Sequence, residues 1–97
     1  MTLKLCYALI STVARLAGST HAALMRGGRA RWAVTARHVA LWLLRHCFGL
    51  SYPESARALQ LRDHTSAINA CRRVDDEIRA GKGWRLDLLV ETIGALA

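Results

Sequence analysis

Apolar residues recur at intervals of three and four along most of the chain, which is the spacing of one face of an α-helix. Over residues 3–17 that face consists of Leu3, Cys6, Ile10, Val13 and Leu16. Gly18 and Ser19 end this pattern, and a short second helical turn is predicted over residues 21–25. No hairpin dipeptide separates two alternating runs and β-branched residues are scattered, so the chain is predicted to be all helical.

Residues 25–32, with the sequence MRGGRARW, interrupt the helical pattern. Two glycines weaken a helix, and three arginines within six residues repel one another unless an anion lies between them. We therefore expect a basic loop here. The next helix is predicted over residues 35–48, with Thr35 as N-cap and Gly49 directly after its C-terminal end. Its buried side is expected to consist of Val39, Leu43 and Cys47.

Residues 52–80 have the pattern of a helix-turn-helix. Ser51 can cap a short helix over residues 52–59 while Glu54 reaches back to it, and Pro53 lies in the first turn, where its missing N–H costs nothing. Residues 60–62 then form a tight turn, and Asp63 caps a longer helix that ends near residue 80. The inner face of this longer helix is expected to contain Ala67, Cys71, Val74 and Ile78.

The segment GKG at residues 81–83 separates this helix from a last amphipathic one. Its apolar positions, which would close the core, are Leu86, Leu89, Val90, Ile93 and Leu96. No internal repeat or low-complexity linker is present, and 97 residues suffice for one small core. The predicted fold is therefore a single all-α domain over residues 1–97, a bundle of about five helices that contains a helix-turn-helix.

The charge of the chain points to an anionic partner. Lysine and arginine number 14 against seven acidic residues, and twelve of the 14 are arginine, whose planar fork pairs with phosphate or with a guanine edge. Residues 1–73 carry eleven basic and two acidic side chains, whereas residues 74–97 carry three basic and five acidic ones. The basic field therefore belongs to the first three quarters of the chain.

Three cysteines, Cys6, Cys47 and Cys71, lie far apart in apolar surroundings and lack a metal-ligand spacing. Buried reduced thiols are the expected state, which favours the cytoplasm, and no metal or other cofactor is expected. The apolar start of the chain is interrupted by Ser11, Thr12 and Arg15 and has helical spacing, so we prefer an amphipathic helix to a targeting segment. No apolar run reaches the roughly 18 residues of a membrane span.

The polar cluster at residues 62–66 admits a catalytic, a DNA-reading and a purely structural interpretation. Asp63, His64 and Ser66 are close in sequence, so on a helix their side chains diverge by about 100° per residue and do not converge on one nucleophile. This argues against an enzyme. The first turn of the second helix in a helix-turn-helix is the part that meets base edges, whereas a solvated surface with Asp63 as a simple cap is the structural alternative.

The sequence of residues 36–73 favours the DNA-reading interpretation over the purely structural one. The run ARHVALWLLRHCFGLSYPESARALQLRDHTSAINACRR resembles the C-terminal DNA-binding domain of the bacterial replication initiator DnaA. The signature of that family is an Arg-Asp-His-Thr-Thr/Ser element, a stretch of small residues and Cys-Arg-Lys/Arg. The resemblance extends more weakly over residues 10–96. It implies a sequence-specific duplex DNA-binding domain, associated with the nucleoid and without catalytic activity.

The resemblance also implies roles for individual residues. The signature helix enters the major groove of a DnaA box, Arg29 in the basic loop reaches the adjacent minor groove, and Arg45 contacts the phosphate backbone. Pro53 matches a helix start that docks on a phosphate, and Arg37 with His38 matches an Arg-Gln pair. The expected DNA-binding residues are Arg29, Arg37, His38, Arg45, Tyr52, Pro53, Arg62, Asp63, His64, Thr65, Ser66 and Asn69. The tryptophans Trp32, Trp42 and Trp84 are expected in or beside the core and not as base-stacking platforms.

Five positions depart from the family pattern: His38 replaces glutamine, Tyr52 replaces leucine, Gln60 with Leu61 replaces a glycine-containing turn, and Ser66 replaces threonine. The chain also lacks the GxxxxGK[ST] phosphate loop of an ATPase. We therefore expect a competitor or regulator of replication initiation or transcription that binds DnaA-box-like DNA and competes with the full-length initiator. The alternative is a protein-interaction module that retains the helix-turn-helix as a scaffold.

Overall fold

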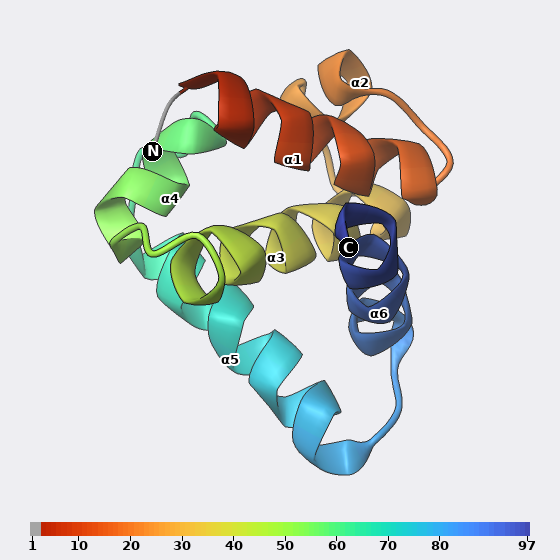
Figure 1. Ribbon diagram of the computed structural model, residues 1–97. Coiled ribbons are helices and arrows are strands. Elements are labelled where there is room, and N and C mark those ends of the chain that lie inside the picture. The colour runs from red at the N-terminus through yellow and green to blue at the C-terminus, as the bar shows by residue number, and fades with distance from the viewer. Residues whose placement is uncertain (1–2) are drawn as a thin grey trace.

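The computed structural model describes residues 3–97 and contains six helices within that range. Their order along the chain is α1 (Leu3–Leu16), α2 (His21–Met25), α3 (Arg31–His46), α4 (Tyr52–Ala58), α5 (Thr65–Ala80) and α6 (Trp84–Leu96). Figure 1 shows α3 crossing the middle of the molecule, with α1 on one side of it and α5 on the other. No strand occurs among the described residues, so the all-α prediction is confirmed.

The core forms around α3 because this helix is buried on several sides. Its central residues Val39, Ala40, Leu43 and Leu44 are at most 1% exposed, and α1, α5 and α6 all pack against it. Cys6, Ile10 and Val13 of the predicted α1 face are buried, and so is Leu9, which was not predicted. Burial of such side chains is the main stabilising term for a domain of this size.

The helix-turn-helix consists of α4, the turn at residues 59–64 and α5. Ser51 Oγ accepts from the Glu54 N–H at 3.2 Å, and Glu54 Oε1 accepts from the Ser51 N–H at 2.9 Å. This confirms the predicted capping box, and Pro53 lies in the first turn of α4 as expected. In the turn, Gln60 has φ +58°, a left-handed conformation that is rare for a residue with a Cβ atom.

The start of α3 was predicted wrongly. The helix begins at Arg31 with Ala30 as N-cap, so the basic loop is confined to residues 26–30 and Thr35 is a buried residue inside the helix. Gly49 has the expected left-handed φ of +76°, but it lies two residues after the C-cap, Cys47. Cys47 itself is exposed, whereas Cys6 and Cys71 are buried thiols as predicted.

Three helix faces also differ from their prediction. In α6, Val90, Ile93 and Leu96 are exposed, and the residues that face the core are Leu88, Leu89 and Thr92. Ile78 at the end of α5 and Leu3 at the start of α1 are exposed as well. Trp32 and Trp42 are half-buried beside the core, as expected, but Trp84 is 56% exposed and was placed wrongly.

Asp63 was expected to be the N-cap of the signature helix, but α5 begins at Thr65 and its N-cap position lies one residue later than predicted. His64 occupies the N-cap position without a capping side chain, and Asp63 still bonds the first amide of the helix. The C-terminal end agrees with the prediction, because Gly81 is the C-cap with φ +73°.

Candidate nucleic-acid interface

Five consecutive residues at the start of α5 form an exposed polar turn: Arg62, Asp63, His64, Thr65 and Ser66. Asp63 Oδ1 accepts a 2.9 Å hydrogen bond from the Thr65 N–H, which shapes the turn and lowers the pKa of the Asp63 carboxyl. Further along α5, Ala67 is buried and Asn69 is exposed, as expected, and Ala70 is buried as well. The polar ends of the first turn are thus free to meet a partner.

The same geometry argues against a catalytic triad. Asp63 uses its carboxylate on the Thr65 amide and not on the imidazole of His64. A triad needs the carboxylate to orient the histidine and the histidine to reach the nucleophile. The interpretation of this cluster as a catalytic site therefore finds no support in the arrangement of its side chains.

The start of α4 lies beside the start of α5. Pro53, Arg62 and His64 line one shallow hollow together with Ala56, Arg57 and Leu61. Next to it, the guanidinium of Arg45 lies 5.0 Å from the ring centroid of Tyr52, in cation–π geometry. Arg45 Nε is buried and has no hydrogen-bond partner among residues 3–97, so only the outer guanidinium nitrogens can reach a ligand. The fold therefore brings these predicted residues from α3, α4 and the turn before α5 into one region.

Arg37 of α3 is hydrogen-bonded to the backbone of α2 and of the loop 26–30. Its Nη2 donates to the Gly28 carbonyl at 2.6 Å and its Nη1 to the Leu24 carbonyl at 3.4 Å. Burial lowers the pKa of the half-buried guanidinium. Arg37 thus ties the end of α2 and the loop 26–30 to α3, and Arg29, which that loop carries, is exposed.

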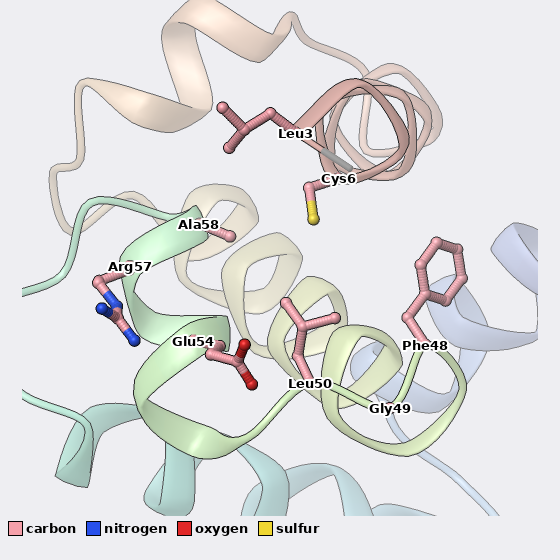
Figure 2. Close-up of a pocket in the computed structure, with 8 residues that line it drawn as sticks. All are labelled: Leu3, Cys6, Phe48, Gly49, Leu50, Glu54, Arg57 and Ala58. Atoms are coloured by element: carbon pink, nitrogen blue, oxygen red, sulfur yellow. The ribbon is translucent and has the colours of Figure 1, made fainter. Parts of the chain in front are cut away.

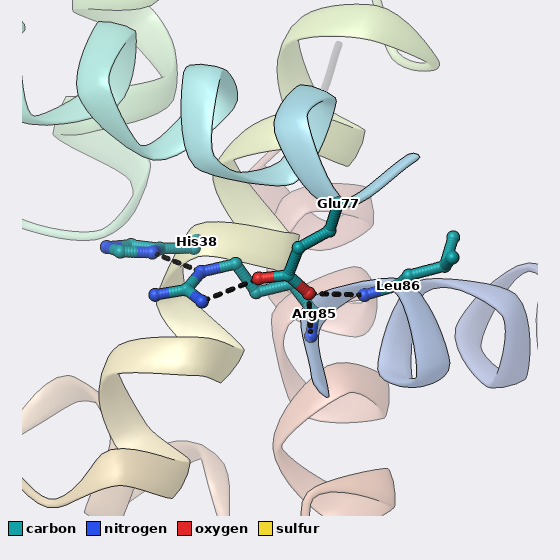
Figure 3. Close-up of polar contacts among 4 residues, drawn as sticks. All are labelled: His38, Glu77, Arg85 and Leu86. Carbon is teal, nitrogen blue, oxygen red and sulfur yellow. Dashed lines mark hydrogen bonds and ion pairs between the residues drawn. The ribbon is translucent and has the colours of Figure 1, made fainter. Parts of the chain in front are cut away.

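His38 lies in a polar network between three helices (Figure 3). Arg85 Nε donates to His38 Nδ1 at 2.9 Å, and Arg85 Nη1 pairs with Glu77 Oε2 at 2.7 Å. Burial, followed by the positive charge of Arg85, lowers the pKa of His38 to about 4, so the ring is neutral at neutral pH. Hydrogen bonds from Arg85 and Leu86 lower the pKa of the Glu77 carboxyl, although burial alone would raise it. The network was not predicted, since His38 and Arg85 are far apart in sequence.

Two features near the predicted residues were missed. Arg31 lies over the indole of Trp84, with the guanidinium carbon 4.4 Å from the ring centroid. Trp42 Nε1 donates to Asp75 Oδ1 at 2.9 Å and links α3 to α5. Neither contact gave a local signal in the sequence, because they depend on how α3 packs against α6 and α5.

Another hollow lies between the start of α1 and α4, and it shares Arg57 with the hollow at the start of α5. Figure 2 shows Leu3 and Cys6 of α1 facing Leu50 and the α4 residues across it. Glu54 is already committed there to the capping box, and backbone hydrogen bonding by Ser51 lowers the pKa of its carboxyl. None of the predicted DNA-binding residues lines this hollow.

Within residues 3–97, no three His, Cys, Asp or Glu side chains gather closely enough to hold a metal ion. None of the helices between Leu3 and Leu96 combines the length and apolar composition that a membrane span requires.

Comparison with known proteins identifies the region that carries this interface. Residues 7–74 match the family described as the bacterial DnaA protein helix-turn-helix. The chain is also similar to the chromosomal replication initiator protein DnaA of Thermomicrobium roseum, with 37% identity over 68 residues. The corresponding proteins of Roseiflexus castenholzii and Corynebacterium jeikeium are 38% and 36% identical over 61 and 74 residues.

The matches cover most of this chain but little of the relatives. They span 70%, 63% and 76% of the chain and 15%, 13% and 13% of the respective DnaA proteins. The family match ends at residue 74 and includes α4 and the first part of α5. It leaves out the end of α5 and all of α6.

Proposed function

The chain belongs to the family of bacterial DnaA helix-turn-helix domains, which bind DNA, and on this premise we propose that it recognises DnaA-box-like sites in double-stranded DNA. The observation that carries the proposal is the exposed first turn of α5, where Asp63, His64, Thr65 and Ser66 all face solvent. In a helix-turn-helix this turn enters the major groove. Thr65 offers a methyl group to thymine, and Asp63 offers an acceptor to a cytosine amino group.

Backbone contacts would fix the register of this turn on the duplex. Arg45 presents its outer guanidinium nitrogens beside Tyr52, and Pro53 lies close to Arg62 and His64. These residues come from elements that flank the start of α5, which is where the sugar–phosphate strands border the major groove. Asn69, one turn along the exposed side of α5, adds a further polar group toward the groove.

The basic loop 26–30 would supply the contact outside the major groove. Arg29 is exposed and is assigned to the neighbouring minor groove, where an inserted arginine senses the width of the groove. Arg37 holds the backbone of this loop through the Gly28 carbonyl, so it acts on DNA binding through Arg29. His38 accepts a hydrogen bond from Arg85, so it would act on DNA binding by supporting the position of α3.

If this chain and a DnaA-type initiator bind the same box, occupancy of the box by one regulates binding by the other. Two proteins that bind the same box compete by mass action, so this chain would exclude a DnaA-type initiator wherever its free concentration exceeds its dissociation constant. A competitor or regulator of replication initiation or transcription, bound to the nucleoid, is therefore the biological role that we propose.

A footprint on a fragment of a replication origin tests this proposal. We expect the 97-residue chain to protect box-like sites without unpairing the neighbouring duplex, and to reduce the unpairing caused by an added full-length initiator. A single-strand-selective probe reports the unpairing. Protection spread evenly over the fragment would contradict box recognition, and would leave the helix-turn-helix as a scaffold for binding another protein.

A further inference from the structure

A hollow of about 340 Å³ separates the start of α3 from the start of α6. Its walls carry three guanidinium groups and one indole, and the lining residues are Arg29, Arg31, Val34, Thr35, Trp84 and Arg85. One wall, including Arg29 and Arg31, lies within the matched family region, whereas Trp84 and Arg85 lie beyond it. The hollow therefore adds residues of α6 to the surface that carries Arg29.

Trp84 is held in place although it is 56% exposed. Glu77 Oε1 accepts from the Arg85 N–H at 2.8 Å and from the Leu86 N–H at 3.2 Å, which anchors the first turn of α6 to α5. Arg31 lies against the indole at 4.4 Å from its centroid. A large exposed aromatic side chain that is fixed in this way loses little conformational entropy when a ligand covers it.

Charge distinguishes the two sides of Trp84. On the side of the hollow, Arg29 and Arg31 are exposed, while the Arg85 charge is balanced by Glu77. A neighbouring hollow, which shares Thr35 and Trp84 with this one, is lined by Asp87 and Glu91. An anion is therefore attracted to the arginine side and repelled from the other, so the indole forms the boundary of an anion site.

The combination of two exposed guanidinium groups and an indole suits a sugar–phosphate unit. Guanidinium pairs with phosphate oxygens in a bidentate manner, and the apolar face of a deoxyribose can pack on an aromatic ring. We infer that this hollow binds the backbone of duplex DNA flanking the box, with Arg31 on a phosphate and the part of the Trp84 indole that Arg31 leaves exposed against the adjacent sugar. The inference rests on the proposed function, because Arg29 places the hollow next to the minor-groove contact.

The test compares two duplexes, one limited to the box and one extended by several base pairs on each side. We expect the 97-residue chain to bind the extended duplex about three- to tenfold more tightly, since an added phosphate contact contributes in this range. Trp84→Ala and Arg31→Gln should each remove most of that gain and leave affinity for the short duplex nearly unchanged. Trp84→Phe, which keeps an aromatic face, should retain part of it.

Arg79→Ala is the charge-matched control, because Arg79 is exposed near the end of α5 and pairs with Asp76. It should leave the gain intact, and circular dichroism confirms that each variant is folded. An unchanged gain in both Trp84→Ala and Arg31→Gln would overturn the inference, as would preferential binding of a single strand through Trp84. The chain could bind box and scrambled duplexes equally well while Trp84→Ala and Arg31→Gln still remove the gain in affinity from the longer duplex. In that case the proposed function fails and the backbone site stands.

Discussion

Arg85 Nε donates a hydrogen bond of 2.9 Å to His38 Nδ1, and this contact joins α6 to the middle of α3. The same guanidinium pairs with Glu77 of α5, so one side chain connects three helices (Figure 3). His38 must be neutral to accept this hydrogen bond. The helix that lies outside the family match is therefore coupled to the helix that carries Arg37 and Arg45.

Protonation of His38 should make the stability of the fold depend on pH. The pKa of His38 is lowered by burial and by Arg85 from 6.5 to about 4, so between these values the unfolded chain takes up a proton that the folded chain does not. This contribution is complete above pH 6.5 and is lost as the pH falls toward 4, which we expect to cost about 1 to 3 kcal/mol. Urea unfolding at pH 7 and pH 4.5 measures it.

His38→Gln is the matched control, because glutamine keeps an acceptor and does not titrate. The variant should lose less stability than the natural chain between the two pH values. If both proteins lose the same free energy of unfolding, the neutral His38 in the network with Arg85 is not responsible.

Arg37 should act on DNA binding through the loop that carries Arg29. Because Arg37 bonds the Gly28 and Leu24 carbonyls, Arg37→Ala is expected to release the loop and to weaken box binding by about 1 kcal/mol. If the effect passes through Arg29, the double variant with Arg29→Ala should bind about as weakly as Arg29→Ala alone. Fluorescence anisotropy measures box binding by the natural chain, the two single variants and the double variant. Strict additivity of the two losses in binding free energy would show that Arg37 contacts DNA independently.

Base and phosphate contacts should separate by their dependence on the sequence of the duplex. Thr65→Ala and His64→Ala are expected to cost about 1 to 3 kcal/mol on the preferred box and little on random DNA. Arg45→Ala, which removes the guanidinium beside Tyr52, should weaken both complexes to a similar extent. Equal effects of all three substitutions on both duplexes would contradict the assignment of the α5 turn to base edges.

Gln60 should be a point of backbone strain in the turn between α4 and α5. Its φ of +58° costs a residue with a Cβ atom about 1 kcal/mol, so Gln60→Gly is expected to raise the free energy of unfolding by about 0.5 to 1 kcal/mol. Gln60→Ala keeps the Cβ atom and should bring no such gain. Thermal unfolding of both variants distinguishes relief of strain from loss of the side chain, and an equal effect of the two would exclude strain.

The helices were predictable from the sequence where local signals act alone. Ser51 and Glu54 specify the start of α4 through their own hydrogen bonds, and Gly81 ends α5 through its left-handed φ. The start of α3 was missed because Ala30 offers no capping side chain. The first residue of the helix, Arg31, instead makes a cation–π contact with Trp84 of α6. No pattern within α3 contains that information.

The faces of α6 show a second limit of sequence reasoning. Leu86, Leu88, Leu89 and Val90 are all apolar, so spacing alone does not decide which side faces the core. The structure buries Thr92, whose hydroxyl donates to the Leu88 carbonyl at 2.8 Å, and exposes Val90. In the candidate site, the exposed turn at the start of α5 followed from the helix-turn-helix pattern, whereas the contacts of Arg37 and His38 within the protein depend on long-range packing.

Binding of the 97-residue chain to a DnaA-box duplex and to a scrambled duplex, across a series of salt concentrations, tests the central claim most directly. We predict much tighter binding to the box at every salt concentration, and a log–log slope of roughly −4 to −7 if about five to eight phosphates are engaged. Equal affinity for the two duplexes, or an affinity that does not change with salt, would contradict it.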